Sequence, residues 1–138
     1  MADRSILVVD DDAAELEGFA RILEREGFEV RRSTDPVAAL EIASAFIPDA
    51  IVVDLRMPEF DGIAFLQSLR DTRALASVPA AIVTGDYLID DGLIASARAL
   101  RADVLLKPIW ADELVAMVRR LVGRRTTTTA RGRIDEAN

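Results

Sequence analysis

The chain has 138 residues, of which 51% are hydrophobic, and a formal net charge of −7, so we expect one globular domain and no direct contact with nucleic acid, whose phosphates attract basic surfaces. It contains no cysteine and no histidine, which excludes disulfides, thiolate chemistry, histidine metal sites and a phosphorylated histidine. No apolar run reaches the ~20 residues of a membrane span, and the first residues are not a secretory signal, so we expect a cytoplasmic protein without a membrane partner.

Short apolar runs alternate along the chain with segments of helical periodicity. The predicted strands cover about residues 6–9, 28–32, 50–53, 78–83 and 104–106. The predicted helices cover about residues 13–26, 36–46, 62–70, 91–100 and 111–122. Asp35 and Pro36 suit the N-cap and first position of the second helix, and Gly27 suits the end of the first helix.

The strict alternation of strand and helix predicts a (βα)5 domain of the α/β class. Such a chain forms a parallel sheet with helices on both faces, and five units are too few for an eight-stranded barrel, so we expect an open doubly wound sheet. Its ligand site should lie beyond the carboxyl ends of the strands. Residues 1–123 are expected to form this domain, and the polar residues 124–138 are expected to form a disordered tail or linker stub.

Polar residues collect where the predicted strands end. Residues 10–12 are three aspartates after the first strand, Asp54 follows the third, residues 84–85 (Thr-Gly) follow the fourth, and Lys107, the only lysine beside sixteen arginines, follows the fifth. Neighbouring carboxylates repel one another unless a cation relieves them, and Mg2+ prefers oxygen ligands. Taken alone, residues 10–12 are equally consistent with a helix N-cap. Together, these residue types favour phosphoryl transfer to a carboxylate.

These motifs resemble the receiver domain of response regulators. The similar segments are residues 6–12, residues 54–62, Thr84-Gly85 and Lys107-Pro108, and the resemblance covers about residues 4–122. It implies the CheY-like, flavodoxin-like fold, with strand order 2-1-3-4-5.

The resemblance implies a Mg2+ site built from four residues. Asp11 would ligate the ion directly, and Asp10 would hold it mainly through water. Asp54 would be the third carboxylate at the ion. The backbone carbonyl of Arg56 would be a further ligand.

The resemblance also implies roles for the residues around the phosphoryl group. Asp54 would be the phosphoacceptor, and Thr84 would donate a hydrogen bond to the incoming group. Lys107 would pair with Asp54 at rest and with a phosphoryl oxygen afterwards. The bond from Lys107 to Pro108 would be cis, and Gly85 would leave room beside the acceptor.

Four positions depart from the family pattern or vary within it. Val104 stands at the switch position, where receivers usually have a tyrosine or phenylalanine, so the ordinary aromatic switch is in doubt. Arg101 stands where glycine is common. Arg56 and Asp86 flank the reaction, and we hypothesise that this pair of opposite charges slows loss of the phosphoryl group. An unchanged dephosphorylation rate in Arg56→Ala would contradict that hypothesis.

The expected function is that of a stand-alone receiver in a two-component or phosphorelay pathway. It would accept its phosphoryl group from a histidine kinase or a histidine phosphotransfer protein and act through an unknown downstream protein. It would catalyse only its own phosphorylation and dephosphorylation. The resemblance leaves open a homodimer through the last two helices.

Three alternatives remain open at this stage. The chain can be a fragment of a larger regulator, or a receiver-like binding module that works without phosphate. A Mg2+-dependent phosphatase acting on small substrates is disfavoured, because the predicted loops are short and offer no substrate-covering insertion.

Overall fold

In a computed structural model of the chain, residues 4–54, 62–85 and 91–137 are described. Within them, strands and helices alternate in the predicted order. The strands are β1 (Ser5–Val9), β2 (Glu29–Ser33), β3 (Ala50–Asp54), β4 (Ala80–Thr84) and β5 (Ala102–Leu106). The α-helices are α1 (Ala13–Arg25), α2 (Pro36–Phe46), α3 (Gly62–Asp71), α4 (Asp91–Ala99) and α5 (Ala111–Ala137), with a short 3-10 helix at Arg73–Leu75 that was not predicted.

The predicted helix boundaries of α1 and α2 have local causes. The Asp35 carboxylate accepts a hydrogen bond from the backbone N–H of Ala38 at 2.8 Å, and Pro36 occupies the first turn of α2. Gly27 follows α1 with a φ of 93°, a backbone conformation that favours glycine. These observations confirm the predicted N-cap and helix end.

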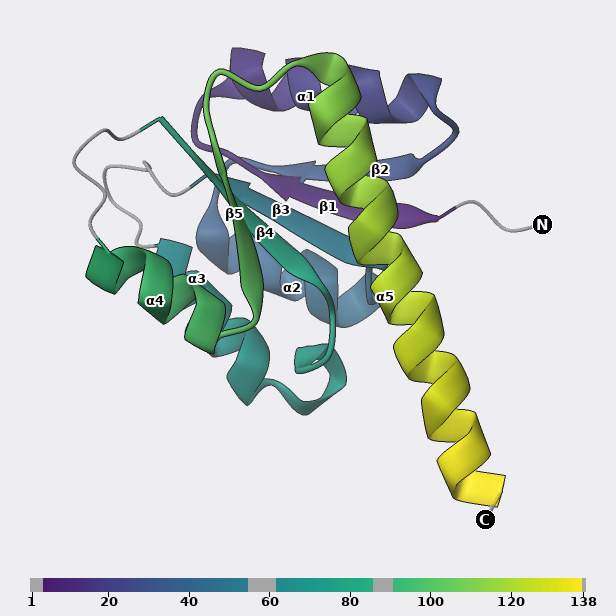
Figure 1. Cartoon of the computed structure of the whole chain (residues 1–138). Coiled ribbons are helices and arrows are strands. Elements are labelled where there is room, and N and C mark those ends of the chain that lie inside the picture. Colours follow the sequence, from purple (N-terminus) through teal and green to yellow (C-terminus); the bar gives the residue numbers. More distant parts are fainter. Residues whose placement is uncertain (1–3, 55–61, 86–90, 138) are drawn as a thin grey trace.

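The strands form one parallel sheet in the order β2-β1-β3-β4-β5, which confirms the predicted doubly wound fold. The register places Asp54 opposite Val83 and Thr84 opposite Leu106. The carboxyl ends of β3, β4 and β5 therefore lie at the same edge of the sheet (Figure 1).

Alternate residues along the strands point to opposite faces of the sheet, and each face has its own apolar cluster. On one face, Val8 of β1 and Val52 of β3 pack with the buried residues of α1 and α5. On the other face, Val9 and Val53 pack with buried residues of α2, α3 and α4. This division explains why the central strands are apolar at nearly every position, since both faces are covered.

The sequence predicted that the last helix ends near residue 122, but the structure differs. Helix α5 continues to Ala137, so the structure has helix over most of the segment that was predicted to be a disordered tail, and its second half extends beyond the sheet (Figure 1). Gly123 does not adopt the positive φ of a helix-ending glycine. The first turns of α5 are packed against the sheet, and a helix nucleated in this way extends by one hydrogen bond for each residue ordered. The division of the chain at residue 123 stays a prediction.

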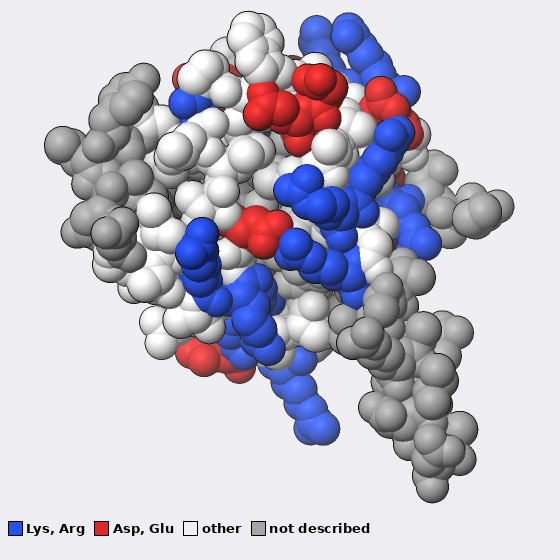
Figure 2. All heavy atoms as spheres, viewed as in Figure 1, with Lys and Arg blue, Asp and Glu red and all other residues white. Residues whose placement is uncertain are grey.

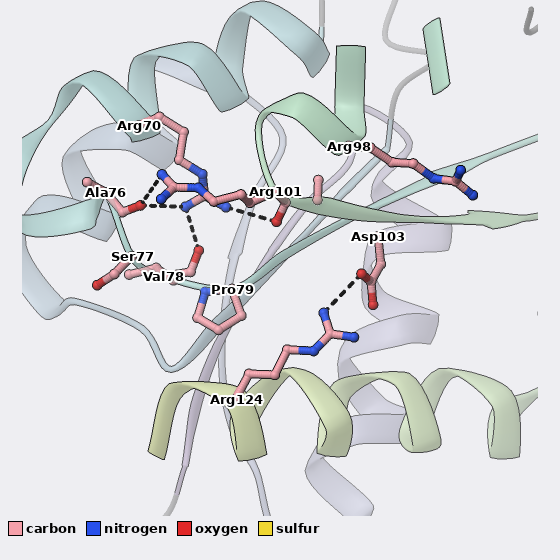
Figure 3. A pocket seen from close by; sticks show the side chains of 10 residues that line it. Arg70, Ala76, Ser77, Val78, Pro79, Arg98, Arg101, Asp103 and Arg124 are labelled. Carbon is pink, nitrogen blue, oxygen red and sulfur yellow. Dashed lines mark hydrogen bonds and ion pairs between the residues drawn. The ribbon is translucent and has the colours of Figure 1, made fainter. Parts of the chain in front are cut away.

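Arg70 of α3 fixes the amino-terminal ends of β4 and β5. Its Nε donates to the carbonyl of Leu100 at 2.8 Å, and its Nη1 donates to that of Val78 at 2.6 Å. Arg101 lies beside it and donates to the carbonyl of Ala76 at 2.8 Å (Figure 3). Burial, together with the charge of Arg101, lowers the pKa of Arg70 to about 10. A cavity of about 420 Å³ lies at this end of the sheet, and two of the arginines that line it, Arg70 and Arg101, donate hydrogen bonds to the backbone of the turns.

The charge of the surface is unevenly distributed, although the chain is acidic overall. Figure 2 shows Lys and Arg side chains gathered over β5 and the first half of α5. Among the side chains that the structure describes in α4, the α4–β5 turn and α5, the exposed arginines are Arg98, Arg101, Arg119, Arg120 and Arg124. One of them, Arg124, pairs with Asp103 of β5 at 3.0 Å.

Candidate functional site

The polar residues that the sequence placed at the strand ends are buried together at the carboxyl edge of the sheet. Asp10 directly follows β1 and is 0% exposed, Asp54 ends β3 and is 5% exposed, and Thr84 ends β4 and is 0% exposed. Few charged groups are buried without a partner, because desolvation of a charge is costly. The burial of two carboxylates at one sheet edge therefore calls for compensating positive charge.

Lys107 supplies part of this charge. Its Nζ lies 3.1 Å from Asp54 Oδ2 and 2.5 Å from Glu15 Oε1. Its backbone N–H donates to the carbonyl of Thr84 at 2.8 Å, which ties the residue to the end of β4. Burial lowers the pKa of Lys107, but the hydrogen bonds and charges of Glu15 and Asp54 outweigh it, so the pKa lies above its ordinary value. The expected pairing of Lys107 with Asp54 is present, and the bond to Pro108 is cis, as expected.

The surroundings of Asp10 disfavour the charged form of its carboxyl group. Burial and the charges of Asp54 and Glu15 raise its pKa to about 7, against the opposing effect of a hydrogen bond from the backbone N–H of Asp12. That N–H donates to Oδ1 at 2.9 Å. Oδ2 is buried and, within the described part of the chain, has no hydrogen-bond partner. A cation beside Oδ2 would satisfy both its charge and its lone pairs.

Three carboxylates meet closely enough to share a divalent cation. Asp10, Glu15 and Asp54 each offer an oxygen, and these oxygens lie within 4.8 Å of one another. An all-oxygen donor set with an unsatisfied buried carboxylate fits a hard ion such as Mg2+. Asp11, predicted as the direct ligand, is exposed and does not belong to this close group. The role of Asp11 stays a prediction.

Glu15 is the functional candidate that the sequence reasoning missed. It lies three residues after Asp12, the N-cap of α1, whose carboxylate accepts from the backbone N–H groups of Ala14 and Glu15. An acid at this spacing is typical of a capping box, in which it would hydrogen-bond to the backbone of the cap. The backbone N–H of Asp12 donates to Asp10 instead, and the Glu15 carboxylate contacts Lys107. The signal that could have revealed Glu15 is its place in the first turn after a strand that ends in the site.

Of the other residues predicted near the site, two lie in described parts of the chain and two do not. Gly85 is half-buried directly after β4, and Val104 is half-buried in β5, where it packs against the apolar cluster of the α4 side. The suggested effect of Val104 on switching stays a prediction. Arg56 and Asp86 lie outside the described residues, so their suggested pairing also stays a prediction.

None of the helices in the described ranges is both long enough and apolar enough to cross a membrane.

Comparison with solved structures matches the fold to receiver domains. A CheY-like receiver domain protein from Methanospirillum hungatei superposes with a TM-score of 0.83 at 23% identity, over 92% of this chain and 99% of that one. The signal receiver domain of a signal transduction histidine kinase from Syntrophus aciditrophicus gives 0.76 at 29% identity, over 87% and 90%. The first likeness shows the fold alone.

Sequence relatives point the same way. The transcriptional regulatory protein PrrA of Mycobacterium tuberculosis is 39% identical over 123 residues, which are 89% of this chain and 52% of PrrA. The response regulator MprA of Mycobacterium leprae is 36% identical over 119 residues, which are 86% of this chain and 51% of MprA. The chain thus spans about half the length of these relatives. Because the family model of the response regulator receiver domain matches residues 6–119, the chain belongs to the response regulator receiver domain family.

Proposed function

We propose that the chain accepts a phosphoryl group on Asp54 from the phosphohistidine of a histidine kinase or a histidine phosphotransfer protein. A carboxylate oxygen of Asp54 would attack phosphorus, and the phosphorus–nitrogen bond to the donor histidine would break. The electron pair of that bond would go to the imidazole nitrogen. The product would be an aspartyl phosphate, and the chain would catalyse only its formation and its hydrolysis.

One observation carries this proposal: Lys107 Nζ pairs with Asp54 Oδ2 at 3.1 Å, beside an Asp10 oxygen that has no hydrogen-bond partner in the described residues. Lys107 would neutralise charge on the acceptor and, after transfer, on a phosphoryl oxygen. The hydroxyl of Thr84, buried at the end of β4, would donate to a second phosphoryl oxygen.

The acidic edge also supports a divalent cation. Asp10, Asp11, Asp54 and the backbone carbonyl of Arg56, which lies outside the described residues, would hold it. Mg2+, when bound, supplies positive charge that offsets the repulsion between the carboxylates and the phosphoryl oxygens. The orphaned oxygen of Asp10 supports this assignment.

A second candidate is that the chain is the receiver part of a longer regulator, as its coverage of about half of PrrA and MprA favours. In that case any contact with DNA would belong to the remaining part, and the proposal that this chain itself makes none still stands. As a stand-alone receiver it would act on a downstream protein in the cytoplasm, and a homodimer through the last two helices is a further proposal.

The test is incubation with acetyl phosphate and Mg2+, followed by intact-mass measurement. We expect a gain of one phosphoryl group that is absent without Mg2+ and absent in Asp54→Asn. Asp49→Asn is the matched control, because it removes one carboxylate at the opposite end of β3 and should leave the gain unchanged.

Two results would contradict the proposal. Phosphorylation that persists in Asp54→Asn would mean that the acceptor is another residue. A folded chain that gains no mass from acetyl phosphate or from phosphorylated kinases would instead favour a binding module that works without phosphate.

A further inference from the structure

The ammonium of Lys107 is shared between two carboxylates, and only one of them belongs to the phosphoacceptor. Its contact with Glu15 Oε1, at 2.5 Å, is shorter than its contact with Asp54 Oδ2, at 3.1 Å. The Lys107 side chain is 20% exposed and that of Glu15 is 27% exposed, so water screens this pair only in part. At rest, Lys107 is therefore held as firmly by helix α1 as by the acceptor.

Glu15 also lies close to where the phosphoryl group has to sit. One of its oxygens is within 4.8 Å of an oxygen of Asp54 and of an oxygen of Asp10. An aspartyl phosphate carries about two negative charges, whereas the Asp54 carboxylate carries one, so phosphorylation adds about one negative charge to this space. Glu15 would repel that group, and it would compete with it for the same ammonium.

We propose that Glu15 is a positioning residue that holds Lys107 at rest and opposes phosphorylation of Asp54. This inference depends on the proposed function, since it assigns a restraint to the same site. The restraint is released when Lys107 turns from Glu15 to a phosphoryl oxygen, so the ion pair between α1 and Lys107 changes with the phosphorylation state.

The decisive variant is Glu15→Gln, measured with acetyl phosphate at saturating Mg2+. Glutamine keeps the size of the side chain and suits the first turn of a helix, so the fold should be retained. We expect phosphorylation to be about tenfold faster, which corresponds to only part of the Coulomb energy of two unit charges at this separation near a protein surface. Glu15→Asp keeps the charge on a shorter side chain and should give a smaller increase.

Glu17→Gln is the matched control. It removes the same charge from the same helix, but the Glu17 carboxylate contacts Arg32 of β2, with Oε2 2.9 Å from Nε, and not Lys107. We expect its phosphorylation rate to equal that of the wild type. An equal increase in Glu17→Gln would mean that net charge alone sets the rate, and it would overturn the assignment to Glu15.

A spectroscopic measurement tests the contact independently of phosphorylation. Lys107 is the only lysine, so 15N-lysine labelling gives a single side-chain ammonium signal. In the protein without metal, Glu15→Gln should shift this signal and Glu17→Gln should not. Beryllium fluoride, which mimics a phosphoryl group, should shift the wild-type signal and bind about tenfold more tightly to Glu15→Gln.

The outcomes separate the two proposals. If the wild type is phosphorylated and Glu15→Gln matches it in rate and in the lysine signal, the role of Glu15 is refuted while the proposed function stands. If neither protein takes up a phosphoryl group or beryllium fluoride, the proposed function fails and the inference fails with it.

Discussion

Replacing Asp10 with asparagine should stabilise the metal-free protein, and increasingly so as the pH rises. The folded state raises the pKa of Asp10 from 3.8 to about 7, so it binds this proton more tightly than the unfolded chain does. This proton therefore contributes to the free energy of unfolding. The contribution is fully present below pH 3.8 and is lost as the pH rises through about 7. An asparagine side chain at this position carries no charge, so the Asp10→Asn variant avoids this loss.

The magnitude follows from the size of the shift. Roughly three pKa units at about 1.4 kcal/mol each give an upper limit of about 4 kcal/mol above pH 7. Between pH 5 and pH 8, the difference in unfolding free energy between Asp10→Asn and the wild type should grow by about 2.6 kcal/mol. Any effect of the new amide group itself is constant over this range, so the change with pH isolates the charge.

Urea unfolding in EDTA at pH 5 and pH 8 measures this difference. Asp71→Asn, which replaces an exposed carboxylate at the end of α3, is the control for loss of one negative charge. Millimolar Mg2+ should stabilise the wild type more than Asp10→Asn at pH 8, because binding to the folded state adds to stability. A difference between variant and wild type that is the same at both pH values, or a Mg2+ effect equal in both proteins, would refute the reasoning.

Two further predictions concern the frame of the domain. Arg70→Met should lower the unfolding free energy by about 3 kcal/mol, since it removes charge-assisted hydrogen bonds to turn carbonyls. Urea unfolding measures this loss, and Arg73→Met, at an exposed position, is the control. Equal losses in the two variants would exclude the turn contacts as the cause. Truncation after Arg124 should reduce the helical circular dichroism signal and change the unfolding free energy by less than about 0.5 kcal/mol, whereas an unchanged signal would contradict the extension of α5 in solution.

The architecture could be predicted because the strands and helices have clear local signals. β3 and β4 are apolar at nearly every position, the helices between strands have caps such as Asp35, and strict alternation leaves few topologies. The positions of Asp10, Asp54 and Thr84 follow from the same reasoning, because all carboxyl ends of a parallel sheet share one edge. The sequence identified these residues because each stands at the end of a predicted strand, and no knowledge of their contacts was needed.

The features that escaped prediction depend on contacts between distant residues. Glu15 meets Lys107 across the space between α1 and the end of β5, and its spacing from the N-cap suggests a capping role that it does not have. Arg70 reaches the carbonyl of Leu100, thirty positions along the chain, and periodicity cannot reveal such a contact. The end of α5 was misplaced because the polar composition of residues 124–138 was taken as a sign of disorder, although the helix continues through most of them.

The sheet also acts as a partition within the domain. The cluster under α1 and α5 and the cluster under α2, α3 and α4 have no side chain in common among the described residues. A repacking beneath α4 therefore has no side-chain route to the opposite face and has to pass through the strand backbones. Substitutions in one cluster should therefore have little direct effect on the packing of the other cluster.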